Sequence, residues 1–150
     1  METKNANREK IYQDAMEIMA KGYSCAESVV GAVYRNLETG LPEKVVGIAS
    51  GFGGGIGGSG NTCGALTGGV MAIGMVLGSD DLENVNNKKA RTLANEFISW
   101  FAEENNKKST MCSVILEDFE KGTPIQFTYC QQLTAQSAVK AVELIMREQV

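Results

Sequence analysis

The sequence predicts an all-α fold, an irregular bundle of six or seven helices, in a single domain that spans residues 1–150. Apolar residues recur at three- and four-residue steps through most of the chain, and no segment alternates convincingly with a period of two. Glycine and proline divide this pattern into pieces of helical length. With 43% hydrophobic residues, the chain is large enough to bury a core without disulfide bonds.

Three helices are expected in the first 50 residues. In the first, four residues share one apolar face before Gly22 ends the pattern: Ile11, Ala15, Ile18 and Met19. The second begins at Cys25 and ends before Gly40, and its apolar positions are Ala26, Val29, Val30, Val33, Tyr34 and Leu37. Pro42 and Glu43 open a short third helix that ends near Ser50, because proline is favoured at the first helical position.

The central helix is expected to follow a glycine-rich loop. An apolar run without charged side chains covers residues 63–77, and Cys63 falls at its first or second helical position. The run is shorter than the roughly 20 residues that a bilayer-spanning helix needs. We therefore expect a buried core helix and no membrane span.

Three further helices are expected in the second half of the chain. A long helix covers residues 81–104, with Ala90, Leu93, Ala94, Phe97, Ile98 and Phe101 on one face. A short helix covers residues 112–120 and stops at Gly122-Thr123-Pro124. The last helix points four residues inward: Leu133, Val139, Val142 and Ile145.

Charge and the N-terminal residues restrict the function and the location. A net charge of −4 and a pI near 4.9 give no basic surface for nucleic acid, so we expect no nucleic-acid partner. Residues 1–5 are polar and charged, unlike a secretory signal, and we expect a cytoplasmic protein. In a reducing compartment, cysteines more often serve catalysis, redox sensing or metal binding than permanent cross-links.

The four cysteines are the candidate catalytic residues, and the chain has no histidine. Each cysteine lies just after a residue that can cap a helix: Ser24 before Cys25, Thr62 before Cys63, Ser109 or Thr110 before Cys112, and Thr128 before Cys130. The partial positive charge at a helix N-terminus favours the thiolate, the reactive form of cysteine. The alternative is that these side chains are small buried hydrophobic groups.

The glycines offer a second candidate site. Residues 55–60 match the dinucleotide-binding pattern GxGxxG. In a nucleotide-binding fold a second strand follows this motif, but here the residues as far as Asp80 are predicted to form one helix, so the match is weak. Gly64 and Gly68 lie four residues apart on one helical face. They serve either close helix packing or contact with a bound cofactor.

Two kinds of chemistry fit the cysteines. As redox thiols, one thiolate attacks a substrate and a second resolves the adduct, with Cys112 and Cys130 as one pair and Cys25 and Cys63 as the other. As metal ligands, all four bind zinc or an iron–sulfur cluster. Common zinc and ferredoxin sites use ligands in close sequence pairs, which this chain lacks, so the spacing favours thiol redox chemistry. A non-catalytic interaction protein with redox-sensing cysteines is a third alternative.

The order Cys25, then residues 63–68 (Cys-Gly-Ala-Leu-Thr-Gly), then Cys112, then Cys130 resembles the redox-active protein family labelled by its C-GCAxxG-C-C pattern. The resemblance covers nearly the whole chain. One departure is that glycine follows Cys63 here, where the label places it before the cysteine. The resemblance implies a redox role with an unknown redox partner, and a functional link to a transporter. Separately, the small-residue helix faces are compatible with a homodimer.

Overall fold

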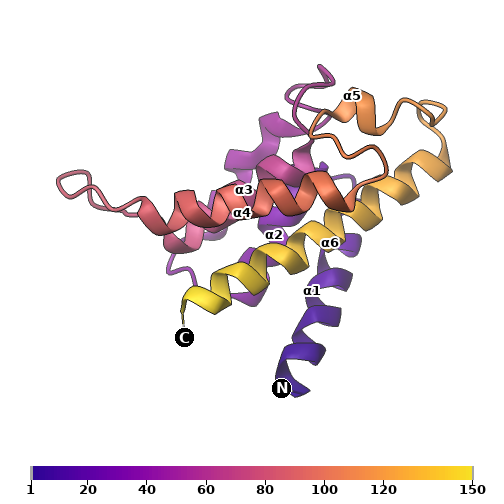
Figure 1. Ribbon diagram of the computed structural model, residues 1–150. Coiled ribbons are helices and arrows are strands. Elements are labelled where there is room, and N and C mark those ends of the chain that lie inside the picture. Colours follow the sequence, from indigo (N-terminus) through magenta and orange to yellow (C-terminus); the bar gives the residue numbers. More distant parts are fainter. Residues whose placement is uncertain (1, 150) are drawn as a thin grey trace.

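The computed structural model describes residues 2–149, with side chains from residue 7 onward, and it confirms the all-α fold. Within these residues the chain forms six α-helices and one 3-10 helix, and no strand (Figure 1). The elements are α1 (Glu2–Ala20), α2 (Cys25–Asn36), η1 (Glu43–Phe52), α3 (Gly64–Leu77), α4 (Lys88–Glu104), α5 (Cys112–Ile115) and α6 (Pro124–Glu148). No helix of the described residues is long and apolar enough to cross a membrane.

The core lies where α2, α3 and α6 meet. Helix α6 packs against α1, α2, α3 and α4, while α2 packs against α1, α3 and η1. In Figure 1 α4 crosses in front of α3, and α6 runs below α4 and in front of α2. Fully buried side chains from four of these helices fill the centre, among them Val33, Ile73, Phe97 and Ile145.

Close approach between helices depends on glycines of α3. A methyl group at Gly69 would overlap the ring of Phe97 on α4, and one at Gly68 would lie 2.8 Å from the carbonyl oxygen of Ala26 on α2. Both positions are too tight for any side chain. The glycines of α3 therefore allow α2 and α4 to pack closely against two different faces of the same helix.

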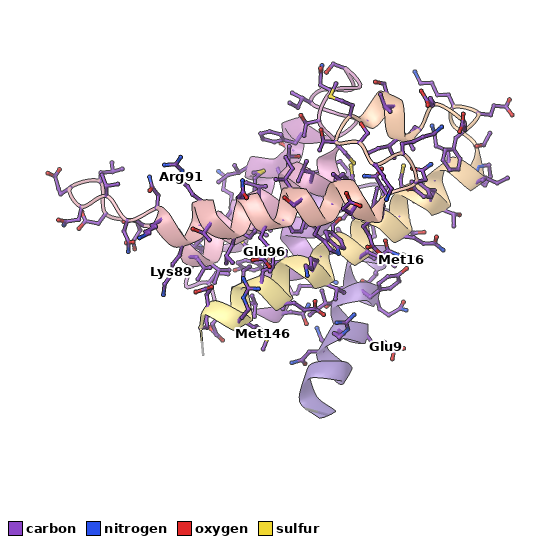
Figure 2. All side chains as sticks on the ribbon, in the orientation of Figure 1. Glu9, Met16, Lys89, Arg91, Glu96 and Met146 are labelled. Atoms are coloured by element: carbon purple, nitrogen blue, oxygen red, sulfur yellow. The ribbon has the colours of Figure 1, made fainter. Side chains whose placement is uncertain are left out.

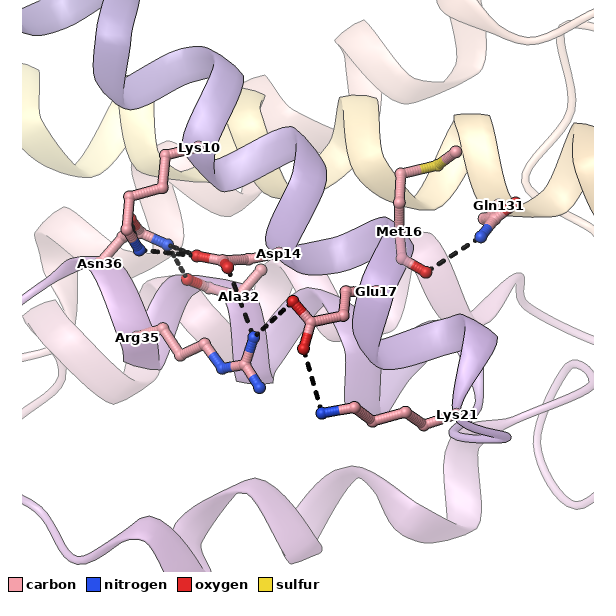
Figure 3. A network of polar contacts seen from close by, with 9 residues as sticks. All are labelled: Lys10, Asp14, Met16, Glu17, Lys21, Ala32, Arg35, Asn36 and Gln131. Atoms are coloured by element: carbon pink, nitrogen blue, oxygen red, sulfur yellow. Dashed lines mark hydrogen bonds and ion pairs between the residues drawn. The ribbon is translucent and has the colours of Figure 1, made fainter.

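Helices α1 and α2 are joined by a polar network around Asp14 (Figure 3). The Asp14 carboxylate accepts hydrogen bonds from Lys10 at 2.8 Å and from Asn36 at 2.8 Å, and pairs with Arg35 at 3.3 Å. Burial raises the pKa of Asp14, but the hydrogen bonds from Lys10 and Asn36 outweigh it and leave the pKa below its usual value. The carboxylate thus stays ionised between the two helices.

Helix α6 is tied to its neighbours at two places. Gln131 donates a hydrogen bond of 2.9 Å to the backbone carbonyl of Met16 on α1 (Figure 3). Farther along, Glu96 of α4 faces the C-terminal end of α6 (Figure 2), where Arg147 donates to both of its carboxylate oxygens at 2.8 and 2.9 Å. These polar contacts supplement the apolar packing of α6 against its neighbours.

Two of the predicted helices are shorter than expected. Helix α4 begins at Lys88 and not at Asp81. The Asp81 carboxylate accepts hydrogen bonds from the Glu83 backbone and the Asn84 side chain, a local turn that competes with helix formation. Helix α5 ends at Ile115, well before Glu120.

Helix α6 is longer than expected. It begins at Pro124, where Thr123 caps the helix by accepting a hydrogen bond from the Gln126 backbone. The segment Gly122-Thr123-Pro124 is therefore the start of α6 as well as the end of the preceding turn. Proline suits the first helical position because the N–H it lacks would have no partner there.

Candidate functional site

All four cysteines line one cavity of about 210 Å³. They come from the start of α2, the residue before α3, the start of α5 and the first half of α6. Besides the cysteines, the lining consists of apolar residues, Gly54, Ser24 and Thr134, and it contains no Asp, Glu, Lys or Arg. The lining residues are Met19, Ser24, Cys25, Gly54, Cys63, Ala65, Cys112, Ile115, Leu116, Cys130, Leu133 and Thr134.

Cys25 is the first residue of α2, as the sequence predicts. Ser24 caps the helix by accepting a hydrogen bond of 3.3 Å from the Glu27 backbone, and Glu27 accepts one of 3.1 Å from the Ser24 backbone. This reciprocal capping box fixes the first turn of α2. The Cys25 sulfur is thereby held at the positive end of the helix, which favours the thiolate.

The glycine-rich loop covers the site with an unusual backbone. Residues 54–58 all have positive φ, including Ile56 at 69°. Only glycine adopts this conformation at low cost, which explains why four of these five residues are glycine. The left-handed turn brings the Gly54 N–H to the Cys25 sulfur and the Gly55 backbone against Cys112. The GxGxxG segment thus packs on the cysteines, and it follows no strand within the described residues.

A short backbone bridge joins Cys63 to Cys112, which lie far apart in the sequence. The Cys63 N–H donates to the Thr110 carbonyl at 2.8 Å, and the Cys112 N–H donates to the Asn61 carbonyl at 2.6 Å. Thr62 and Met111 form an isolated antiparallel bridge between them. These bonds place the start of α5 beside the start of α3. Cys63 is the residue that precedes α3, one position earlier than expected.

Cys25 and Cys63 form a coupled pair. A hydrogen bond with the Cys63 thiol is the main reason that the pKa of Cys25 is lowered to about 7; burial opposes it, and the backbone N–H groups of Gly54 and Ala26 reinforce it. The same interaction, together with burial, raises the pKa of Cys63 well above that of a free thiol. At neutral pH about half of the Cys25 population is therefore thiolate, beside a protonated Cys63.

The other two cysteines favour the thiol form. Burial, and then the charge of Cys25, raise the pKa of Cys112. The same two effects raise the pKa of Cys130 to about 12.

The predicted position of Cys130 at a helix start is wrong. Because α6 begins at Pro124, Cys130 is its seventh residue and Thr128 is not a cap. Gln131 does not complete a capping box either, and instead binds α1 through Met16. The helix N-terminus thus gives no help to ionisation of Cys130, in keeping with its raised pKa.

Gly64 and Gly68 both face α2. A methyl group at Gly64 would overlap the Cys25 sulfur, and one at Gly68 would lie within 3 Å of the Ala26 backbone. The space beside each glycine is filled by α2, which supports their interpretation as helix-packing residues. Gly64 also allows the Cys25 sulfur to lie directly on the start of α3.

Four thiols around one cavity suit zinc or an iron–sulfur cluster chemically. Among residues 7–149, however, no group of three or more Cys, Asp or Glu side chains is placed to hold a metal ion. The arrangement of the cysteines therefore gives no support to the four-cysteine metal site.

Sequence reasoning did not identify Thr134 as a residue of the site. It is fully buried, and its hydroxyl has no hydrogen-bond partner among the described residues. Cys130, Leu133 and Thr134 all line the cavity from α6. Their spacing of three and four residues places them on one helical face, a signal in the sequence that could have found Thr134.

A protein-family model described as "putative redox-active protein (C_GCAxxG_C_C)" matches residues 23–144. The match covers well over half of the chain and includes all four cysteines. The chain belongs to this family. Comparisons with curated proteins and with solved structures gave no match.

The residues that match the C_GCAxxG_C_C family include nearly all of those that line the cavity. Every residue that lines the cavity lies within the matched range except Met19 of α1. The cysteines that define the family label are thus the ones that the fold brings around one space. The family description supplies the redox character of the protein but no mechanism or substrate.

Proposed function

We propose that the protein is a dithiol redox protein in which Cys25 is the attacking thiolate and Cys63 the resolving thiol. The observation that carries this proposal is the coupled pair itself: two cysteines from different helix starts share a hydrogen bond beneath a cavity. The lowered pKa makes Cys25 the nucleophile. The protonated neighbour is then the nearest thiol that can displace the adduct.

The chemistry balances as a two-electron transfer. The Cys25 thiolate attacks the electrophilic atom of an oxidised substrate, and the leaving group departs with the bonding electrons. Cys63 then loses its proton and attacks the Cys25 sulfur, which expels the bound group and forms a disulfide. Two electrons pass from the thiols to the substrate, and an external dithiol returns the pair to its reduced state.

Cys112 and Cys130 line the same cavity as thiols. In this proposal they exchange with the Cys25–Cys63 disulfide and pass its oxidation onward to the external dithiol. The cycle requires a compartment that keeps dithiols reduced, such as the cytoplasm.

The test is disulfide mapping of intact protein. Reduced protein is treated with one equivalent of diamide, blocked with an alkylating agent, digested and analysed by mass spectrometry. A Cys25–Cys63 disulfide is expected first, and Cys25→Ser should abolish it while Cys112→Ser leaves it unchanged. A first disulfide between any other pair, or none, would contradict the proposal.

The same preparation tests the metal alternative. Protein purified without oxygen is examined by visible absorption and assayed for iron, zinc and sulfide. Stoichiometric metal that disappears in Cys25→Ser would replace the dithiol proposal with a metal-site function. A colourless, metal-free sample with four titratable thiols is the expected result.

A further inference from the structure

Ile56 carries the only side chain in a run of glycines. Residues 53–58 are all glycine except Ile56, which has a φ of 69°. A β-branched residue with positive φ is strained, and glycine would adopt the same conformation at lower cost. Burial does not offset the strain, because Ile56 is 46% exposed and belongs to neither hydrophobic cluster. Strained residues gather at functional sites, so the strain points to a function of the Ile56 side chain at the surface.

The glycine-rich loop that carries Ile56 lies beside Cys112. The backbone N–H groups of Cys112 and Ser113 donate to the carbonyls of Asn61 at 2.6 Å and Gly60 at 3.0 Å. In Figure 1 the loop and α5 lie together at the end of the molecule that is farthest from the two chain termini. Two segments far apart in the sequence thus form one surface next to Cys112.

This surface, made up of residues 54–61 and 112–114, is named here the Cys112 surface. It contains no Asp, Glu, Lys or Arg, although these residues make up 21% of the chain. Besides Ile56 it exposes one further large apolar side chain, Val114, which is 37% exposed. Protein–protein interfaces are depleted of charged residues at their centre. The composition of the Cys112 surface therefore fits contact with another protein.

Cys112 connects this surface with the redox pair. It lines the same cavity as Cys25 and Cys63 and is the least enclosed of the four cysteines, whereas Cys63 is buried. A protein dithiol is too large to enter a cavity of about 210 Å³ and has to react at a sulfur near the surface. A small dithiol that enters the cavity would not need Ile56, which does not line it.

We propose that the Cys112 surface docks the protein dithiol that resets the Cys25–Cys63 pair, with Ile56 as a docking contact and Cys112 as the sulfur that the partner attacks. This inference rests on the proposed dithiol function and assigns the kind of reductant and the place where it binds.

The reset balances as three thiol–disulfide exchanges. The Cys112 thiol loses its proton to solvent, and its thiolate attacks the Cys63 sulfur, forms the Cys63–Cys112 bond and expels Cys25 as a thiolate. A partner thiol then loses its proton and attacks the Cys112 sulfur, which expels Cys63, and Cys63 takes up a proton. The second partner thiol loses its proton and attacks the first partner sulfur, which expels Cys112, and Cys112 takes up a proton. Two electrons pass to the protein, and the partner becomes a disulfide.

The direction of the first exchange follows from the two leaving groups. Attack on the Cys63 sulfur expels Cys25, and attack on the Cys25 sulfur would expel Cys63. The thiol with the lower pKa leaves faster, and the pKa of Cys25 is about 7 whereas that of Cys63 is raised. The exchange also returns Cys25 to the thiolate form in which it attacks the next substrate.

The experiment compares how fast two dithiols reduce the Cys25–Cys63 disulfide. Protein oxidised with diamide is mixed with reduced thioredoxin, a protein dithiol, or with dithiothreitol, a small one, and the remaining disulfide is measured by alkylation and mass spectrometry. At equal concentration thioredoxin should reduce wild type faster. Ile56→Gly should slow thioredoxin about tenfold, as for the loss of one apolar contact, and leave the dithiothreitol rate unchanged. Cys112→Ser should slow thioredoxin at least as much.

The matched control is Ile98→Ala. Ile98 is 40% exposed, much like Ile56, but it lies on α4 and outside the Cys112 surface. Its variant should keep both rates. The pH midpoint of Cys25 alkylation and the melting temperature, measured for every variant, should show that Ile56→Gly keeps the redox pair and the fold intact.

The outcomes distinguish the two proposals. If diamide forms the Cys25–Cys63 disulfide but Ile56→Gly is reduced by thioredoxin as fast as wild type, or is slowed with both dithiols, the docking surface is wrong and the dithiol function stands. The same holds if thioredoxin is no faster than dithiothreitol. It also holds if Ile56→Gly converts a dimer to a monomer in light scattering, because the surface then binds a second copy of the chain. If diamide forms no Cys25–Cys63 disulfide, the dithiol function fails and the inference fails with it.

Discussion

The Cys63 thiol is hydrogen-bonded with the Cys25 sulfur, and this interaction changes the two residues in opposite directions. It lowers the pKa of Cys25 to about 7 and, with burial, raises the pKa of Cys63. A pair of identical groups is thereby divided into a thiolate and a thiol. The pair titrates as a unit, so replacing either residue changes the behaviour of the other.

The reactivity of Cys25 should follow this pKa. Its alkylation rate by iodoacetamide should rise with pH and reach half of its maximum near pH 7, because the thiolate is the reacting form and the folded pKa is about 7. Cys63→Ala removes the hydrogen bond and should move the midpoint upward, toward the value of an ordinary thiol. Cys112→Ala is the control and should keep the midpoint near 7. A midpoint that is the same with and without Cys63 would contradict the coupling.

Cys130 should be the least reactive of the cysteines that are not paired. Burial raises its pKa to about 12, so at pH 8 only about one molecule in 10⁴ carries the thiolate. Native protein treated with iodoacetamide at pH 8 should lose its Cys112 thiol before its Cys130 thiol, as read by peptide mass spectrometry. Denatured protein should show no such order. Alkylation of Cys130 ahead of Cys112 in the native state would place Cys130 in a different environment from the one described.

The sequence predicted the parts of the site that depend on local signals. Ser24 and Glu27 are three residues apart, and this spacing alone identifies the cap that positions Cys25. At Cys130 the same kind of pattern failed. Thr128 and Gln131 have the spacing of a capping box, but they lie inside the helix, because Thr123 and Pro124 form a stronger start signal earlier in the chain.

Other parts of the site depend on contacts that no local pattern contains. The bridge between Thr62 and Met111 brings Cys63 and Cys112 together across 49 residues. The left-handed turn around Ile56 was visible only as an abundance of glycine, which does not specify its direction. The pairing of Cys25 with Cys63 was predicted from the sequence as one of two pairs, and it stays a prediction that the interaction between the two side chains supports.

Asp14 should stabilise the contact between α1 and α2 in a pH-dependent way. Asp14→Asn removes the charge that binds Lys10, Arg35 and Asn36 and should lower the free energy of unfolding by about 1 kcal/mol at pH 7, measured by urea denaturation. Because the folded pKa lies below the usual value, the contribution is complete above about pH 5 and is lost as the pH falls through the folded pKa. The difference between variant and wild type should therefore shrink below pH 4. Glu17→Gln, at an exposed ion pair, should change stability less. A difference that stays constant down to pH 3 would contradict the role of the charge.

The glycines of α3 should differ sharply in their tolerance of a methyl group. At Gly68 the added carbon would lie 2.8 Å from a backbone oxygen of α2, so Gly68→Ala should destabilise the protein by about 1 to 3 kcal/mol. At Gly74, on the same helix, no atom lies within 4 Å, and Gly74→Ala should stabilise the protein by up to about 1 kcal/mol through helix propensity.

Substitution of Gly64 should affect the reactivity of Cys25 as well as the packing of the helices. A methyl group there would overlap the Cys25 sulfur, so Gly64→Ala must displace the sulfur from the start of α3 and from its hydrogen bond with Cys63. The variant should therefore raise the pH midpoint of Cys25 alkylation, whereas Gly68→Ala should lower the melting temperature with a smaller effect on that midpoint. The melting temperature and the pH midpoint of alkylation are both measured for Gly64→Ala, Gly68→Ala and Gly74→Ala. If Gly64→Ala melts at a lower temperature yet keeps a midpoint near 7, Gly64 serves helix packing alone and the start of α3 does not position the reactive sulfur.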